Sequence, residues 1–123
     1  MVDYYKWDIS YKIIGCAINV HNKLWCWYQE IIYQRALVIE FTKNWLRFER
    51  EKEIEIQYDW HFIWKRRVDF AIEDDILLEI KSSPKIFFSN KAQILNYLQI
   101  NKTNIWLLIN FWWQKLEYYR FKS

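Results

Sequence analysis

Asp69 and the run Glu79-Ile80-Lys81 are the residues whose types and spacing are best suited to chemistry. Nine residues lie between Asp69 and Glu79, and each carboxylate stands late in an apolar run. Two carboxylates on neighbouring strands can hold a divalent cation, and a lysine beside them can orient the attacking water. This combination suits the metal-assisted hydrolysis of a phosphodiester.

Alternation of apolar and polar residues indicates how these side chains are directed. Over 67–72, three apolar residues are expected to share one face: Val68, Phe70 and Ile72. Asp69 is then expected on the opposite face. Over 76–81, Glu79 and Lys81 are expected to lie together, opposite the apolar residues of that strand.

The loop between these two strands sets their register. A three-residue loop over 73–75 pairs Asp69 directly with Glu79, and Arg67 with Lys81. A two-residue loop shifts the register by one residue and puts the two carboxylates on opposite faces. An exposed cross-strand charge pair, which is common on antiparallel sheets, is the alternative interpretation of these charges.

The elements that must position these residues follow from periodicity and from helix and turn signals. Asp8 or Ser10 can cap a first helix, Pro84 ends a strand, and Ser89 can cap a later helix. Helices are predicted over about 10–24, 28–43 and 90–100. Strands are predicted over about 47–58, 61–72, 76–81, 104–110 and 115–121. The order ααβββαββ, a hairpin meander followed by a helical crossover, predicts an α+β fold.

The composition otherwise describes one ordinary domain over 1–123. Its net charge of +3 is compatible with a polyanionic ligand but does not establish one. Cys16 and Cys26 have no metal-ligand spacing and are expected to be buried thiols. No leader pattern and no apolar run of membrane-spanning length occur, so we expect a cytoplasmic protein without membrane association.

Several motifs resemble those of a known family, in the right order and over nearly the whole chain. Trp27-x-x-Glu30-x-x-Tyr33 stands where that family has Gly-x-x-Glu-x-x-Tyr. The other matching segments are 11–17, 20–24, 68–70, 79–81, 93–98 and 107–111. By these motifs the chain resembles the GxxExxY protein family, which is assigned to the PD-(D/E)XK nuclease-like superfamily. The resemblance implies a mixed sheet flanked by helices and a nucleic-acid substrate, DNA or RNA.

The resemblance also implies a metal site. Asp69 and Glu79, helped by the Ile80 carbonyl, would bind Mg²⁺ or Mn²⁺. Lys81 would polarise the water or stabilise the developing charge. An exposed charge pair and a solvated strand lysine remain the alternatives for these residues.

Two helices are expected to contribute further catalytic residues. Glu30 has Tyr33 at i+3, so both can face one site, although Glu30 can equally be a capping or salt-bridge residue. Gln93 and Tyr97, at i and i+4, would line the same cleft, unless Tyr97 is simply packed. Asn90 stands where we expect the family to have His, which removes a possible general base or phosphate contact.

Two functions from different classes follow. The first is a Mg²⁺-dependent nuclease or phosphodiesterase that uses a metal-activated water. The second is a nuclease-fold module with little or no activity that binds nucleic acid or a protein partner. Retention of Asp69, Glu79 and Lys81 together favours the enzyme, because a binding module needs positive charge at phosphates and has no need of two carboxylates.

Tryptophan and glycine are present in unusual numbers. The chain has nine Trp and only Gly15, whereas a domain of this size typically carries about nine glycines. The family has Gly at the positions of Trp25, Trp27, Trp45, Trp60, Trp64, Trp106 and Trp112, and Gly also suits Trp7 and Trp113. Trp45 stands where a left-handed residue ends a helix, and Trp60 follows Asp59 where Asp-Gly forms a hairpin turn. We therefore predict positive φ at Trp45 and Trp60.

One cause would explain this pattern. A gene from a lineage that decodes UGA as glycine, translated with UGA as tryptophan, would replace Gly by Trp in one direction only. The abundance of Ile, Lys, Asn, Tyr and Phe fits an AT-rich genome. A natural or engineered aromatic-rich variant is the alternative.

Overall fold

The computed structural model describes residues 4–74, 76–86, 91–101 and 105–122. Within these ranges the elements have the predicted order ααβββαββ, which confirms the α+β class. They are α1 Tyr4–Leu24, α2 Glu30–Lys43, β1 Phe48–Tyr58, β2 His61–Ile72, β3 Ile76–Lys81, α3 Lys91–Asn101, β4 Ile105–Asn110 and β5 Glu117–Lys122. The start of α1 differs from the prediction, because fully buried Ser10 lies inside the helix and cannot be its cap. None of the helices in these ranges is both long and apolar enough to span a membrane.

The described strands form one mixed sheet in the order β1-β2-β3-β4-β5. Neighbouring strands are antiparallel except β3 and β4, which are parallel. A parallel pair needs a long crossover connection, and α3 supplies it. The predicted hairpin meander followed by a helical crossover is thus confirmed.

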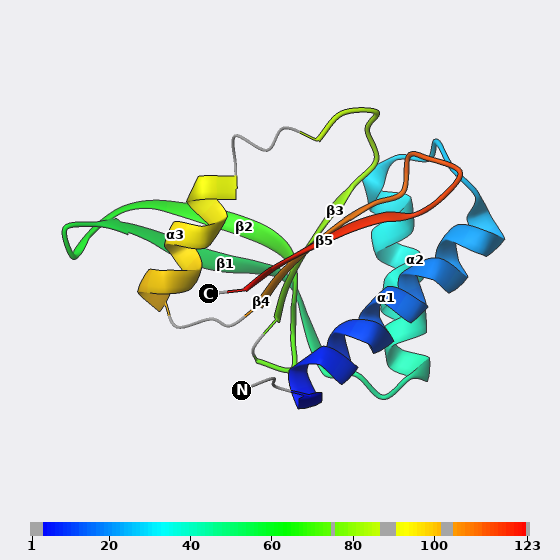
Figure 1. The fold of residues 1–123 in the computed structure, drawn as a ribbon, viewed down its shortest axis with the longest axis horizontal. Coiled ribbons are helices and arrows are strands. Elements are labelled where there is room, and N and C mark those ends of the chain that lie inside the picture. The colour runs from blue at the N-terminus through cyan, green and yellow to red at the C-terminus, as the bar shows by residue number, and fades with distance from the viewer. Residues whose placement is uncertain (1–3, 75, 87–90, 102–104, 123) are drawn as a thin grey trace.

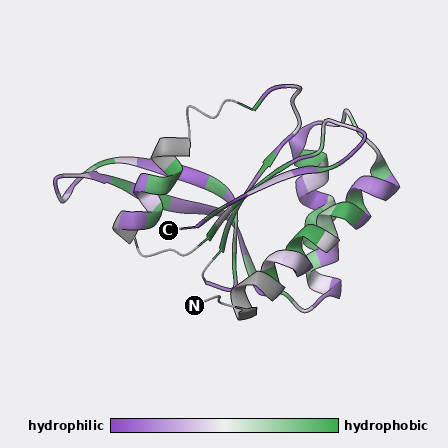
Figure 2. Cartoon of the chain, viewed as in Figure 1, coloured by the Kyte–Doolittle hydropathy of each residue, from purple (hydrophilic) through white to green (hydrophobic). Residues whose placement is uncertain are grey.

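Helices cover both faces of the sheet. Figure 1 shows α1 and α2 on one face and α3 on the other, with the β1–β2 hairpin extending beyond the sheet on the side of α3. One buried cluster joins α1 and α2 to the strands, for example through Ile13, Leu37 and Leu78. A second cluster joins α3 to the opposite face through Leu98 and Trp106. Figure 2 shows hydrophobic residues concentrated in the central strands, whereas the hairpin is largely hydrophilic.

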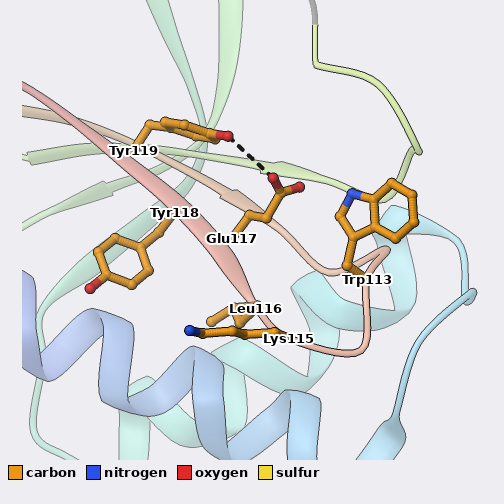
Figure 3. Close-up of a pocket in the computed structure, with 6 residues that line it drawn as sticks. All are labelled: Trp113, Lys115, Leu116, Glu117, Tyr118 and Tyr119. Carbon is orange, nitrogen blue, oxygen red and sulfur yellow. Dashed lines mark hydrogen bonds between the residues drawn. The ribbon is translucent and has the colours of Figure 1, made fainter.

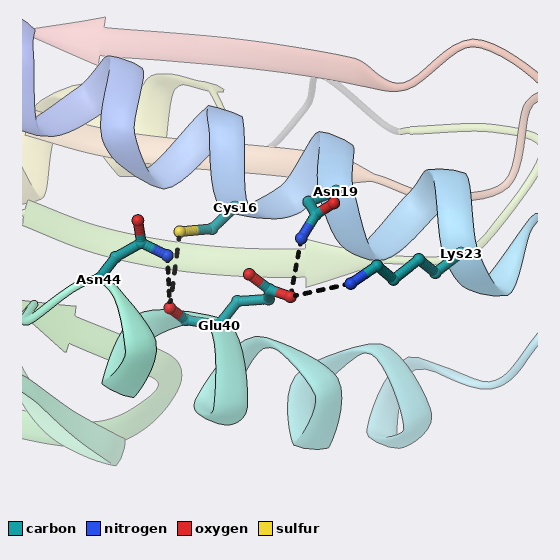
Figure 4. A network of polar contacts seen from close by, with 5 residues as sticks. All are labelled: Cys16, Asn19, Lys23, Glu40 and Asn44. Carbon is teal, nitrogen blue, oxygen red and sulfur yellow. Dashed lines mark hydrogen bonds and ion pairs between the residues drawn. The ribbon is translucent and has the colours of Figure 1, made fainter.

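A polar network fastens α1 to α2 (Figure 4). Asn19 Nδ2 donates a hydrogen bond of 2.8 Å to the Glu40 carboxylate, and Lys23 lies 3.9 Å from the same oxygen. Cys16, whose thiol faces the Glu40 carbonyl, and Cys26 are both free and buried, as predicted. Burial, and next the charge of Glu40, raise the pKa of Cys16 to about 11, so this thiol stays protonated at neutral pH.

Four tryptophans adopt the left-handed backbone conformation that favours glycine. The φ angles are 69° at Trp25, 77° at Trp27, 60° at Trp45 and 65° at Trp60. The prediction of positive φ at Trp45 and Trp60 is confirmed, and these two side chains are 90% and 85% exposed. By contrast, Gly15 lies within α1, where an added Cβ would meet no atom within 4 Å.

The turns around these residues have the geometry of glycine turns. After α2, the N–H of Trp45 donates to the Thr42 carbonyl and that of Leu46 to the Phe41 carbonyl, which is the Schellman arrangement with Trp45 at the usual glycine position. At the β1–β2 turn, Asp59 and Trp60 both have positive φ, as a type I′ hairpin requires.

Candidate metal centre

Asp69 lies where β2 separates from β3. Pairing across these strands follows the three-residue loop that we predicted and ends at Phe70 and Leu78. Continued by one residue, this register places Asp69 opposite Glu79. The regular ladder stops there, and Asp69 Oδ2 accepts the N–H of Ile80 at 2.7 Å.

Strand β2 changes face at the same point. Phe70 and Ile72 belong to the cluster beneath α1 and α2, whereas Val68 belongs to the cluster beneath α3. Our prediction that these three residues share one face is therefore wrong. In β1, Glu51 stands opposite Asp69 with a φ of 51° and is absent from the regular β1–β2 pairing. We call this interruption of the pairing and change of face the bend at Asp69, and alternation cannot be carried across it.

The second oxygen of Asp69 is held by α2. Gln34, which is buried, donates from Nε2 to Asp69 Oδ1 at 3.3 Å. Arg50 on β1 in turn donates to Gln34 Oε1 at 3.0 Å. Both oxygens of Asp69 thus meet neutral donors, and each keeps a further lone pair for a ligand.

Glu79 is buried next to an arginine. It is 7% exposed, and its Oε1 forms an ion pair and hydrogen bond with Nη2 of Arg66. The guanidinium carbon of Arg66 lies 5.1 Å from the ring centroid of Trp106 on β4, within cation–π range. The charge of Glu79 is therefore balanced from within the fold.

Lys81 ends β3 beside both carboxylates. Its carbonyl accepts the N–H of Phe111 at 2.9 Å, which fixes the end of β3 against the residue that follows β4. The side chain is half-buried, and its positive charge lowers the pKa of Asp69 and of Glu79. The structure thus brings Asp69, Glu79, Ile80 and Lys81 together.

Burial nevertheless raises the pKa of both carboxyl groups, because desolvation disfavours the anion. At Asp69 the Ile80 N–H and Lys81 oppose this effect, and at Glu79 the charges of Arg66 and Lys81 oppose it. The negative charge of Asp69 further raises the pKa of Glu79, so the two groups interact. A divalent cation would stabilise both anions at once.

We expect divalent-ion binding to weaken as the pH falls into the raised titration range of these groups, because protons and metal compete for the same oxygens. Without metal, the free energy of unfolding should fall as the pH rises through the raised pKa values, since folding favours the protonated forms. Calorimetric titration with Mn²⁺ at several pH values measures the affinity and the protons released. An affinity that is constant between about pH 4 and pH 8 would contradict a carboxylate site.

Glu30 does not complete the carboxylate pair, contrary to our expectation. It is the exposed first residue of α2, whereas Tyr33 is fully buried and donates its hydroxyl to the Trp25 carbonyl at 2.7 Å. Among the residues that the structure describes, no three His, Cys, Asp or Glu side chains form a group that could hold a metal ion. Gln34, one turn further along α2, reaches Asp69 instead.

The structure describes only part of the predicted contribution of α3. Tyr97 is half-buried and meets Trp106 edge-on, with ring centroids 5.6 Å apart. It therefore packs against the ring over which Arg66 lies. The side chain of Gln93 and the whole of Asn90 fall outside the described residues. That Gln93 and Tyr97 line the cleft stays a prediction.

Sequence reasoning missed the contacts of Gln34, Arg50 and Arg66. Gln34 carried a usable signal, because it lies four residues after Glu30 and so on the same side of the helix. Arg66 belongs to a basic run, 65–67, that could contact phosphates, but alternation assigns Arg66 to the face opposite Asp69 and so does not predict its pair with Glu79. Only the bend at Asp69 reveals that Arg66 and Glu79 meet.

A separate pocket lies at the start of β5 (Figure 3). It is lined by Trp113, Lys115, Leu116, Glu117, Tyr118 and Tyr119, none of which belongs to the carboxylate site. Its one carboxylate, Glu117, accepts hydrogen bonds from the Tyr119 hydroxyl at 3.2 Å and from Asn110 at 2.9 Å. These contacts give Glu117 a structural role, so the chemistry is better sought at Asp69 and Glu79.

Comparison with known proteins identifies the family of the chain. The chain matches the PD-(D/E)XK nuclease superfamily over residues 7–121 and belongs to it. Glu79-Ile80-Lys81 fits the (D/E)XK part of that name.

A solved structure supports the fold. The chain is similar to the protein described as "Crystal structure of SSO0001", with a TM-score of 0.55 and 22% identity over 75% of this chain and 48% of that chain. The present chain thus spans about half the length of that protein, and the likeness concerns the fold alone. No curated protein sequence matched.

Proposed function

We propose that this protein is a Mg²⁺- or Mn²⁺-dependent nuclease that hydrolyses phosphodiester bonds in nucleic acid by means of a metal-activated water. The observation that supports this best is the electrostatic interaction among Asp69, Glu79 and Lys81, where the pairing of β2 with β3 ends. Membership of a nuclease superfamily supports the same reading. We further propose that the chain belongs to the GxxExxY branch, on the motifs given above.

The donor set fits the proposed ion. Mg²⁺ is typically bound through one or two carboxylates and keeps several waters, so a preformed cage of three acidic ligands is not needed. Asp69 and Glu79 would hold it, helped by the Ile80 carbonyl. When bound, the ion supplies a water of lowered pKa and positive charge near the phosphate. Lys81 would orient that water or stabilise negative charge developing on the phosphate oxygens.

Cleavage assays test the proposal directly. The protein is expected to cut DNA or RNA in Mg²⁺ or Mn²⁺ and to be inactive in EDTA. Ca²⁺, with its longer and looser coordination, is expected to support binding without cleavage. Cleavage that persists in EDTA would contradict the proposed mechanism.

The second candidate is a nuclease-fold module that binds nucleic acid without cutting it. Two observations favour it: Glu79 is already paired with Arg66, and no third acidic ligand joins the pair within the described part of the chain. Binding of nucleic acid without cleavage in any of these ions would support this candidate.

The contacts of Asp69 yield a prediction about α2. Gln34→Ala is expected to weaken Mn²⁺ binding about tenfold, because it frees Asp69 from the group that orients it. Glu30→Ala should have a smaller effect, since Glu30 lies exposed one turn earlier. Calorimetric titration of both variants measures the difference. A larger loss of Mn²⁺ affinity in Glu30→Ala than in Gln34→Ala would show that Glu30, and not Gln34, supports the metal site.

We also infer that the cellular product carries glycine at most of the nine Trp positions. Positive φ at four of them and the glycine-type turns at Trp45 and Trp60 support this inference. Trp106 differs from these residues, because it is fully buried in the cluster beneath α3. The inference matters for function because Trp25 and Trp27 precede α2, and aromatic stacking on nucleic acid cannot be assigned to residues that are glycines.

A further inference from the structure

Arg66 and Glu79 form the one contact in the metal site that joins opposite charges through a hydrogen bond, within the part that the structure describes. The Arg66 side chain is 27% exposed and approaches from β2 beyond the bend. Asp69, in contrast, accepts hydrogen bonds from two neutral donors, the Gln34 amide and the Ile80 N–H. A cation that binds Glu79 must therefore compete with the Arg66 guanidinium for the carboxylate. At Asp69 it competes with no charged hydrogen-bond donor.

The charges of the site also favour competition between a bound cation and Arg66. Asp69 and Glu79 carry two negative charges, and Arg66 and Lys81 carry two positive charges that act on both carboxylates. Glu51 also acts on Asp69 but is itself paired with Arg67, so these six charges balance without a metal ion. A divalent ion brings an excess of positive charge, and the guanidinium bound to Glu79 is the group whose displacement removes most of the repulsion.

On the basis of the proposed nuclease function, we propose that Arg66 is the internal counter-ion of Glu79, that a divalent ion displaces it, and that the freed guanidinium binds a phosphate of the nucleic acid. Metal and nucleic acid would then bind cooperatively, because the ion releases a phosphate-binding group. Without metal, the same group is held by Glu79 and is withheld from phosphates.

The side chain of Arg66 suits both partners. A guanidinium presents a planar set of donors that matches carboxylate and phosphate alike. Its partial exposure lets it reach a phosphate from its present position near the surface. The neighbouring Lys65 provides the control, because it is 58% exposed and pairs with Glu53 on β1, and neither charge acts on Asp69 or Glu79.

The first experiment measures metal binding alone. Calorimetric titration with Mn²⁺ compares the unmodified protein with Arg66→Ala, Arg66→Lys and Lys65→Ala at a pH where both carboxylates are ionised. Arg66→Ala is expected to bind Mn²⁺ about tenfold more tightly, because a charged hydrogen bond no longer has to be broken. Arg66→Lys should be intermediate, and Lys65→Ala should match the unmodified protein. Equal or weaker Mn²⁺ binding by Arg66→Ala and Arg66→Lys would overturn the proposal.

The second experiment measures the coupling. Fluorescence anisotropy of a labelled DNA oligonucleotide, single- and double-stranded, is recorded with Ca²⁺ and with EDTA. Ca²⁺ is expected to tighten DNA binding by the unmodified protein, and Arg66→Ala should lose most of this gain, with a salt dependence reduced by about one charge. Lys65→Ala should change DNA binding equally with and without Ca²⁺, because its charge does not act on Asp69 or Glu79. An undiminished gain in Arg66→Ala would overturn the role at phosphate.

These readouts separate the inference from the proposed function. If the protein cuts nucleic acid but Arg66→Ala leaves its Mn²⁺ affinity unchanged, the nuclease function is supported and the counter-ion role of Arg66 is refuted. Tighter Mn²⁺ binding in Arg66→Ala and coupled DNA binding, without cleavage in any ion, would support the counter-ion and refute the nuclease.

Discussion

Asp69→Asn and Glu79→Gln are each expected to lower the rate of nucleic-acid cleavage in Mg²⁺ by at least about a hundredfold, because each removes a negatively charged ligand from a two-carboxylate site. Lys81→Ala should cause a loss of similar order, since it removes the cation beside the reacting phosphate. Initial rates of cleavage of a labelled substrate measure all three. Arg47→Ala is the control, because Arg47 is exposed and pairs with Glu73 and Asp74, outside the carboxylate site.

The same variants should stay folded, and the direction of the stability change provides a second check. Burial raises the pKa of Asp69, so at neutral pH its anionic form costs stability that a neutral isostere does not. We therefore expect Asp69→Asn to have an unchanged or higher Tm by circular dichroism. Glu79→Gln should gain less, because it leaves the Arg66 charge without its partner. A variant that cuts at the original rate would remove its residue from the proposed mechanism.

The register at this site could be predicted because it depends on local information. Alternation within β3 and the loop over 73–75 together predict the pairing of β2 with β3, and the observed pairs follow that register as far as Phe70 and Leu78. The bend at Asp69 could not be predicted in this way. It involves Glu51 on β1, a residue distant in sequence that adopts a positive φ without being Gly, Asn or Asp. Local patterns do not contain that kind of information.

The helical part of the site shows a similar limit. Periodicity correctly predicted the helix over Glu30–Lys43, but it could not predict which of its turns are buried. The burial of each turn depends on the packing of α2 against the sheet, which buries Gln34 and leaves Glu30 exposed. The pair formed by Arg66 and Glu79 likewise depends on the bend at Asp69.

Positive φ angles, in contrast, could be predicted from the sequence at turns that strictly require glycine. The helix end at Trp45 and the hairpin turn at Trp60 were predicted to have positive φ, and both do. Trp25 and Trp27 were not predicted from turn chemistry, because the segment between α1 and α2 has no single standard turn. The sequence resemblance nevertheless identified both as glycine positions.

Replacing Trp25, Trp27, Trp45 and Trp60 together by glycine is expected to raise the stability and solubility of the protein. A left-handed residue with a Cβ costs about 1–2 kcal/mol, so four such residues cost about 4–8 kcal/mol. A domain of this size is typically stable by only about 5–15 kcal/mol, and the added chain entropy of glycine offsets only part of the gain. Chemical denaturation measures the change in the free energy of unfolding.

Alanine at the same positions separates backbone strain from loss of the exposed indole. Trp45→Ala removes the indole but keeps the Cβ, so we expect Trp45→Gly to be stabilised relative to Trp45→Ala by about 1 kcal/mol. Equal stability of the two variants would contradict the strain argument.

The gene and its protein product decide the origin of these tryptophans. UGG codons at these positions would refute recoding, whereas UGA codons, together with glycine in the peptide mass spectrum of the cellular protein, would establish it.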